Sequence, residues 1–208
     1  MVQIKVCGIT REVDAELLIG LGVEAMGLNF YAESPRRISA EQAQTLSQYV
    51  GDRLLCVGVF VNETRVRVRE LIDDVGLDVL QFHGDEHDAH CASFGLPYLK
   101  AVRVDGPVDG AALQMQYPNA CAILLDTYVA GRPGGTGEAF DWSYWPQACE
   151  GKFILAGGLA PDNVRSAIDL VAPWGVDVSG GVEGSTRGQK DPERVARFVK
   201  EVRDVESR

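Results

Sequence analysis

Eight short apolar runs, rich in β-branched residues, divide this chain at a fairly even pitch, and this repetition limits the folds it can adopt. Segments with the helical spacing of apolar residues follow some of them, as over 68–75, 164–171 and 195–202. The runs cover residues 2–7, 25–30, 54–61, 79–83, 98–104, 122–127, 152–157 and 175–179. Eight strand-then-helix units predict an α/β fold, a (β/α)8 TIM barrel, although a doubly wound open sheet shares this alternation. At 208 residues, we expect the chain (1–208) to form a single domain.

Residues typical of helix starts support this division. Ser39 followed by Gln42 predicts a capping box, and Asp191 before a proline predicts the start of the last helix. Thr10 is placed to cap the first helix, and Asn62 precedes the third. We therefore expect helices to begin close to these positions.

The charge balance and the cysteines narrow the setting in which the protein works. A net charge of -10, from 30 acidic and 20 basic residues, disfavours binding to nucleic acid or to an anionic membrane surface. We expect neither a secretory signal nor a membrane-spanning segment. Five cysteines are spread along the chain without a C-x-x-C pair, so we expect reduced thiols and a cytoplasmic location. The cysteines are Cys7, Cys56, Cys91, Cys121 and Cys149.

Chemically capable residues stand at the ends of several predicted strands, where barrels place their active sites. Cys7 closes the first run, His83 the fourth, and Asp126 lies near the end of the sixth. Asp126 follows four apolar residues, which suits a sheltered proton donor, although an aspartate that caps a turn would look the same. Cys7 taken alone is typical of an inert packing thiol. The other strand-end candidates are Asn29, Arg103 and Ser179.

Two glycine pairs and an arginine are candidates for binding anions. Gly157 with Gly158, and Gly180 with Gly181, follow the last two predicted strands, where glycine-rich turns bind phosphate through backbone N–H groups. The same glycines would also serve as tight turns. Arg36, in the loop after the second run, could hold a carboxylate through two hydrogen bonds, or could be a solvated surface residue like its neighbour.

Three histidines and a lysine raise two further chemistries. His83, His87 and His90 lie close in sequence, but no cysteine or carboxylate pattern with ligand spacing completes a site, so we expect no metal. Lys100, within the fifth run, could form a Schiff base if it pointed into the barrel without water. It could equally face outward or pair with a carboxylate.

With these residues in place, the chain resembles the phosphoribosylanthranilate isomerase family over nearly its whole length. The resemblance rests on an ordered series of short motifs, each weak alone and specific together. They lie at 5–10 (KVCGIT), 27–30 with 34–36, 57–62, 81–84, 124–127, 134–137 with 140–142, 157–159, and 176–179 with 181–183.

The resemblance implies an isomerase of tryptophan biosynthesis that rearranges N-(5'-phosphoribosyl)anthranilate by an Amadori reaction, interconverting an aldose and a ketose. Cys7 would be the general base and Asp126 the general acid. The substrate's own iminium would be the electron sink, so no metal or organic cofactor is implied. Nearby positive charge should favour the thiolate of Cys7.

The resemblance also assigns binding groups. Arg36 would hold the anthranilate carboxylate, while Asp177 and His83 would support the site. The phosphate would be bound by Gly157, Gly158, Gly180 and Gly181. Partners would be the small-molecule substrate and, beyond it, neighbouring enzymes of the tryptophan pathway. The loop over 128–141, with its glycines, would suit a mobile segment over the site, although a static loop would look the same.

The chain departs from the family pattern at a few positions. Phe82 stands where leucine is more usual. Ala156, Gly180 and Arg187 replace residues that are commonly serine, serine and proline, which puts fine phosphate affinity in doubt and leaves the reaction intact.

Three other functions stay open. The related histidine-pathway isomerase uses an aspartate base where this chain has Cys7. A Schiff-base aldolase would centre on Lys100. A phosphosugar-binding barrel without catalysis would have no need of both Cys7 and Asp126.

Overall fold

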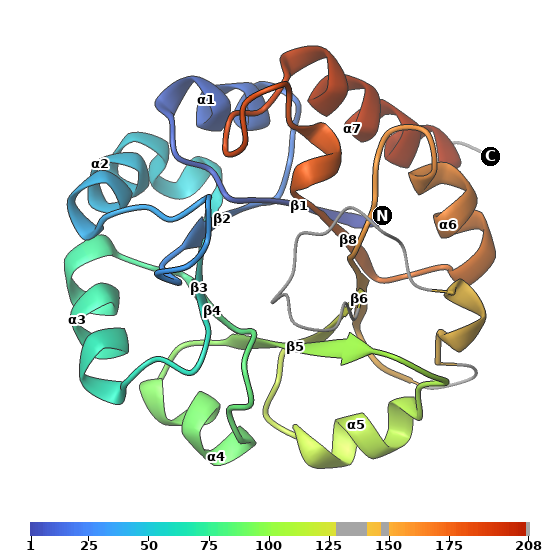
Figure 1. The fold of residues 1–208 in the computed structure, drawn as a ribbon, viewed down its shortest axis with the longest axis horizontal. Helices are drawn as coiled ribbons and strands as arrows, with labels where there is room; N and C mark the ends of the chain where they lie inside the picture. Colours follow the sequence, from blue (N-terminus) through green and yellow to red (C-terminus); the bar gives the residue numbers. More distant parts are fainter. Residues whose placement is uncertain (128–140, 147–149, 207–208) are drawn as a thin grey trace.

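Eight parallel strands form a closed barrel in the order in which they occur along the chain, which confirms the predicted fold class. The computed structural model describes residues 1–127, 141–146 and 150–206, and Figure 1 looks into its ring of strands. The strands are β1 (Gln3–Cys7), β2 (Ala25–Asn29), β3 (Leu55–Phe60), β4 (Val79–Phe82), β5 (Tyr98–Val104), β6 (Ala122–Thr127), β7 (Phe153–Leu155) and β8 (Gly175–Val178). Because β1 pairs with β8, with Gln3 beside Gly175, the ring is closed and the open sheet is excluded.

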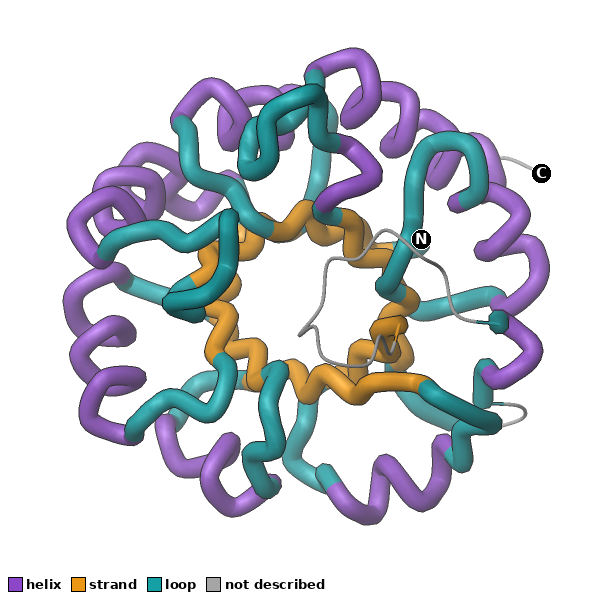
Figure 2. Tube along the Cα trace, in the orientation of Figure 1, coloured by secondary structure: helices purple, strands orange, loops and turns teal. Residues whose placement is uncertain are grey.

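Helices cover the outside of the barrel, so that the strands form an inner ring and the helices an outer one (Figure 2). The α-helices are α1 (Glu12–Gly20), α2 (Ala40–Val50), α3 (Arg65–Val75), α4 (Asp88–Cys91), α5 (Gly110–Gln116), α6 (Val164–Val171) and α7 (Pro192–Glu206). The short 3-10 turns are η1 (Gly51–Arg53), η2 (Ala92–Phe94), η3 (Trp142–Tyr144) and η4 (Gly180–Val182). Between β6 and β7, the described residues include η3 and no α-helix.

Some expectations concern parts of the chain that the structure describes only in part. The predicted loop over 128–141, except Asp141, and Cys149 lie outside the described residues. Among the described helices, none has the length and apolar character needed to cross a membrane.

Apolar residues fill two spaces, one between the strands and the helices and a smaller one inside the barrel. Side chains alternate between the two faces of a strand, so Leu99 and Ala101 face the inside of the barrel while Lys100 faces outward. In β1 and β8 the same alternation directs Lys5 and Asp177 inward, and both are buried. The inside of the barrel therefore contains a buried pair of charged residues as well as its apolar cluster.

Two of the predicted helix starts are confirmed. Ser39 and Gln42 form the predicted capping box at the start of α2. Asp191 precedes α7, and its Oδ1 accepts hydrogen bonds from the backbone N–H groups of Glu193 and Arg194, each at 3.0 Å. Both starts supply acceptors for N–H groups that have no partner within the helix.

Helices also begin close to the other two positions, at Glu12 and Arg65, but neither Thr10 nor Asn62 caps them. Thr10 donates its hydroxyl hydrogen to the Gly188 carbonyl, and Arg11 stands at the N-cap of α1 without a side-chain cap. Asn62 lies in the loop before α3 with φ of 51°, while the side chain of Thr64 caps that helix. In both cases a polar residue near the helix is used by the loop instead.

Candidate active site

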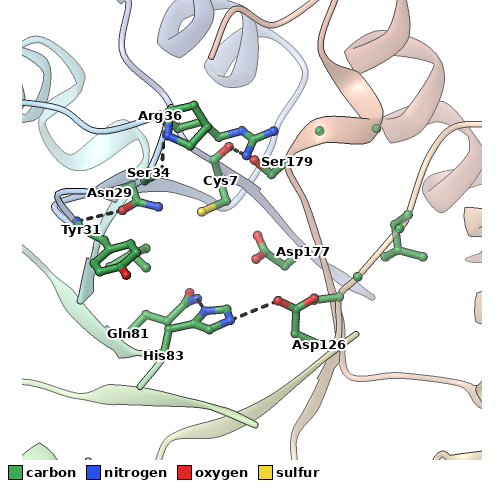
Figure 3. A pocket seen from close by; sticks show the side chains of 18 of the residues that line it. Cys7, Asn29, Tyr31, Ser34, Arg36, Gln81, His83, Asp126, Asp177 and Ser179 are labelled. Atoms are coloured by element: carbon green, nitrogen blue, oxygen red, sulfur yellow. Dashed lines mark hydrogen bonds and ion pairs between the residues drawn. The ribbon is translucent and has the colours of Figure 1, made fainter. Parts of the chain in front are cut away.

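The carboxyl ends of the strands surround a cavity of about 320 Å³. Its lining includes every residue to which the family resemblance assigns a role, although they come from strands and loops far apart along the chain. They are Cys7, Arg36, His83, Asp126, Gly157, Gly158, Asp177, Gly180 and Gly181. Figure 3 shows Cys7 and Asp126 on opposite sides of this space, with the Asp177 carboxylate between them.

Cys7 is fixed at the end of β1 by its neighbours on both sides. Its carbonyl oxygen accepts a hydrogen bond of 3.0 Å from the Ser179 hydroxyl, beyond the end of β8. On the other side, a Cβ atom at Gly27 would lie only 2.7 Å from the Cys7 Sγ. Glycine at position 27 therefore leaves the space that the thiol occupies.

The expectation that nearby charge favours the Cys7 thiolate is correct about the charge and wrong about its net effect. Burial raises the pKa of the thiol, while the positive charges of Lys5 and Lys190 lower it and the negative charge of Asp177 raises it. Burial is the largest of these influences, so the pKa of Cys7 is raised overall. The thiolate needs a further positive charge at the site to become the favoured form.

Asp126 is held on the opposite wall by two hydrogen bonds. Its Oδ1 accepts from the backbone N–H of Thr127 at 2.8 Å, and its Oδ2 lies 3.1 Å from His83 Nε2. His83 Nδ1 lies 3.1 Å from the Gln81 side-chain nitrogen (Figure 3). An amide nitrogen only donates, so in this arrangement Nδ1 accepts and Nε2 carries the proton toward Asp126. Gln81 Oε1 is buried and has no hydrogen-bond partner among the described residues.

Arg36 is buried, and Glu183 sets its orientation. Its Nε lies 2.6 Å from Glu183 Oε1 and its Nη2 2.8 Å from Glu183 Oε2. Lys190 shares the same carboxylate, with Nζ 3.1 Å from Oε1. Burial opposes the charge of Arg36, but the hydrogen bonds and charge of Glu183 outweigh it, so the pKa of Arg36 is raised. Two cations against one carboxylate leave a net positive charge beside the cavity.

The two glycine turns lie against each other at the mouth of the barrel. A Cβ atom at Gly181 would stand 1.8 Å from the Leu159 carbonyl oxygen, which no side chain allows. Gly157 has φ of 78°, and a Cβ there would stand 2.1 Å from Thr127 Oγ1. In the part of the chain that the structure describes, no hydrogen bond engages the N–H groups of Gly157, Gly158, Gly180 or Gly181. These donors are therefore free to bind an anion.

Sequence reasoning missed residues that support the site from behind. The buried Lys5 ammonium lies 2.9 Å from Asp177 Oδ1, directly below Cys7. Glu183 binds both Arg36 and Lys190, and Gln81 contacts His83 as described above. Gln81 and Lys5 each stand two residues before a predicted site residue on the same strand, and this spacing places them on the same face.

Other candidates lie away from the cavity. Lys100 is buried outside the barrel, where its Nζ donates to the Gly84 carbonyl at 2.6 Å and lies 3.2 Å from Glu86 Oε2. The expected carboxylate pairing is thus the one observed.

His90 packs against aromatic rings, and neither His90 nor the exposed Arg103 lines the cavity. Among residues 1–127, 141–146 and 150–206, no group of three or more His, Cys, Asp or Glu side chains is placed to hold a metal ion.

The fold and the cavity define a class of protein, the (β/α)8-barrel enzymes whose site lies at the carboxyl ends of the strands. Within this class, the family described as "N-(5'phosphoribosyl)anthranilate (PRA) isomerase" matches residues 4–201. The chain belongs to this N-(5'-phosphoribosyl)anthranilate isomerase family.

Individual relatives agree over the full length of the chain. The N-(5'-phosphoribosyl)anthranilate isomerase of Pseudomonas fluorescens is 51% identical over 202 residues, which cover 97% of this chain and 96% of the relative. That of Azotobacter vinelandii is 50% identical and covers 98% of each chain. The crystal structure of phosphoribosyl anthranilate isomerase from Thermus thermophilus has a TM-score of 0.87 at 32% identity, covering 98% of this chain and 99% of that one.

A further solved relative carries a ligand. It is a phosphoribosyl anthranilate isomerase in complex with reduced 1-(o-carboxyphenylamino)-1-deoxyribulose 5-phosphate. Its TM-score is 0.80 at 34% identity, over 98% of this chain and all of that one.

Proposed function

We propose that this chain converts N-(5'-phosphoribosyl)anthranilate into 1-(2-carboxyphenylamino)-1-deoxyribulose 5-phosphate, a step of tryptophan biosynthesis. Family membership supports the reaction. One observation carries the assignment of roles, namely that Cys7 and Asp126 face a single cavity from opposite sides. The ligand bound by the solved relative supports a substrate with a carboxyphenyl group at one end and a phosphate at the other.

Asp126 is the proposed general acid. It protonates the furanose ring oxygen, so that the ring opens and an iminium forms at C1. To donate, Asp126 must first carry a proton that faces the ring oxygen. Its carboxyl oxygens still accept from His83 Nε2–H and from the Thr127 N–H, and these two donors stabilise the carboxylate that is left once the proton has moved.

Cys7 is the proposed general base. As a thiolate it removes the proton from C2, and the electron pair of that C–H bond moves into the iminium to give an enolamine. The enolamine takes a proton at C1 and releases the hydroxyl proton at C2, so the product is an isomer of the substrate. The iminium brings a positive charge close to a thiol whose pKa burial has raised. The substrate therefore helps to generate the base that acts on it.

The remaining groups bind the two anionic ends of the substrate. Arg36 faces the cavity with its guanidinium held by Glu183, and it is the proposed partner of the anthranilate carboxylate. The glycine turns at 157–158 and 180–181 are the proposed phosphate site.

We also propose a cytoplasmic location and association with neighbouring enzymes of the pathway. Co-purification of those enzymes with the tagged protein would test the second proposal.

The test of this function is a direct assay. Purified protein with a chelator present should abolish the fluorescence of N-(5'-phosphoribosyl)anthranilate catalytically. Cys7→Ser and Asp126→Asn should each lower kcat by roughly 10² or more, the usual scale for loss of an acid or base. Cys121→Ser is a matched control, because this thiol lies outside the cavity and should leave the rate unchanged. Wild-type rates in both site variants would show that the roles are wrong, and no turnover by the wild-type protein would leave a binding protein.

A further inference from the structure

Lys5 lies inside the barrel, two residues before Cys7 on β1. Alternation along the strand places both side chains on its inner face, so the lysine lies one layer below the thiol. Its side chain is only 5% exposed. The neighbouring layer of the barrel interior is otherwise apolar, with Leu124 and Ile154 among its members.

A buried ammonium group in such a place requires an explanation. Its partner is Asp177, with Oδ1 at 2.9 Å from Nζ. Removing two charges from water is costly, and an apolar pair of similar size often stabilises a fold as well or better. Stability alone therefore explains the Lys5–Asp177 pair poorly, and its neighbours in the barrel must be considered.

The Cys7 thiol is what lies next to it. Gly27, on β2, stands beside Cys7 in the sheet. A Cβ atom at Gly27 would lie 2.7 Å from Cys7 Sγ and 3.1 Å from Lys5 Nζ. Because Gly27 has no side chain, the Cys7 sulfur and the Lys5 ammonium group border the same small space, and no atom at position 27 separates them.

Other charged groups also face Cys7. Asp177 on β8 opposes a negative sulfur, while Lys190, before α7, favours it. Arg36, in the loop after β2, interacts with Cys7 as well, but its guanidinium and Lys190 are both engaged by Glu183. His83 and Asp126 lie across the cavity, beyond Asp177. Among these described groups, Lys5 is the cation on the strand that carries Cys7.

We propose that Lys5 is a positioning residue for the general base: its ammonium group stabilises the Cys7 thiolate, and Asp177 holds that group in place while competing with the sulfur for its charge. The proposal rests on the proposed function of Cys7. It predicts opposite effects for loss of the Asp177 charge alone and for loss of both charges of the pair. Loss of the Asp177 charge frees Lys5 to pair with the sulfur, whereas loss of both charges removes the stabilisation.

The test measures Cys7 directly and needs no substrate. Iodoacetamide modifies thiolates, and mass spectrometry of the Cys7 peptide reports the alkylation rate at that residue as a function of pH. With Asp177→Asn, the midpoint should move to lower pH by about one unit, a roughly tenfold faster reaction on the acid side. With Lys5→Met and Asp177→Asn combined, it should move to higher pH by a similar amount. Lys200→Met, at an exposed position in α7, should leave it unchanged.

A merely structural pair would not give this pattern. If both variants move the midpoint in the same direction, or leave it where it is, the proposal is wrong. If the double variant with methionine does not fold, Lys5→Gln combined with Asp177→Asn replaces it, because Asp177→Asn alone also removes a negative charge that faces the thiol. A midpoint for that variant that is not above the Asp177→Asn midpoint contradicts the proposal. The isomerase assay is separate, so opposite shifts in a protein without turnover would overturn the proposed function and leave only the effect of Lys5 on the Cys7 thiol.

Discussion

Arg36 and Glu183 meet in a buried pair of parallel hydrogen bonds, with Nε 2.6 Å from Oε1 and Nη2 2.8 Å from Oε2. A planar guanidinium held along one edge has its orientation fixed by its partner. The carboxylate on which it rests also accepts from Lys190. The direction in which Arg36 presents its remaining donors is therefore set by a residue behind it.

Glu183→Gln should weaken substrate binding more than it slows the reaction. The amide cannot accept two hydrogen bonds from the guanidinium edge, so Arg36 loses its fixed orientation. We expect KM to rise about tenfold, about 1.4 kcal/mol, with kcat changed little. Glu201→Gln, which removes the partner of Arg165 in a half-buried pair between α6 and α7, is the matched control and should leave KM as it is. A fall in kcat with an unchanged KM would contradict this role.

His83→Asn and Gln81→Met should lower kcat and leave KM almost unchanged. Both residues act on Asp126, through two hydrogen-bonded contacts of 3.1 Å each, and the proposed role of Asp126 is in the reaction and not in binding. Hydrogen bonds to charged groups contribute about 1.5–3 kcal/mol, so we expect a roughly tenfold to hundredfold loss in steady-state kinetics. The double variant should lose no more than the worse single variant, since the two residues act in series. Fully additive losses would show that they act separately.

Gly157→Ala should destabilise the fold more than Gly95→Ala, although both glycines have almost the same backbone conformation. Their φ angles are 78° and 80°. A Cβ at position 95 would meet nothing within 4 Å, so that variant carries only the backbone penalty of roughly 1–2 kcal/mol. At position 157 the added atom would also collide with Thr127 and crowd Asp126 Oδ1 at 2.9 Å. Urea denaturation should rank the variants, and Gly157→Ala alone should lower kcat; equal stability losses would contradict the collision.

Buried thiols should make the protein less stable in alkaline solution. Burial raises the pKa of Cys56 to about 11 and that of Cys91 to about 12. Unfolded thiols lose their protons near roughly pH 8.5, so above that pH the unfolded chain binds fewer protons than the native one. The free energy of unfolding then falls as the pH rises, until the native thiols also ionise.

This prediction can be checked by urea denaturation at a series of pH values from about 8 to about 11, a range that begins near the thiol pKa of the unfolded chain and rises toward that of the folded protein. Replacing both Cys56 and Cys91 by alanine should flatten the decline, whatever its effect on stability at neutral pH. A decline as steep as that of the wild-type protein would show that these thiols do not cause it.

The strands could be predicted because closure of the barrel buries both faces of each strand in a regular way. Runs such as 122–127 are apolar on both faces, and their ends coincide with the observed strand ends within a few residues. The strand-end candidates gathered at one cavity for the same reason, since parallel strands all end on one side. Helix caps were harder to predict, because asparagine occurs both at N-caps and in loops, and Asn62 lies in a loop.

The charged support of the site could not be predicted from local pattern. Val2, Ile4 and Val6 alternate with polar residues, which normally indicates one face toward a core and one toward water. In a closed barrel the second face is the interior, so Lys5 is buried where the pattern suggests solvent. Glu183 and Lys190 likewise look like surface charges until the fold brings Arg36 between them and the cavity.

The pairing of the first strand with the last has a consequence for how the protein is made. Cys7 leaves the ribosome early, but the Ser179 hydroxyl that holds its carbonyl and the Asp177 carboxylate that balances Lys5 are synthesised near the end. A growing chain thus carries the Cys7 thiol for most of its synthesis without the groups that orient it. Catalytic competence should arrive in one step, when the final strand closes the ring.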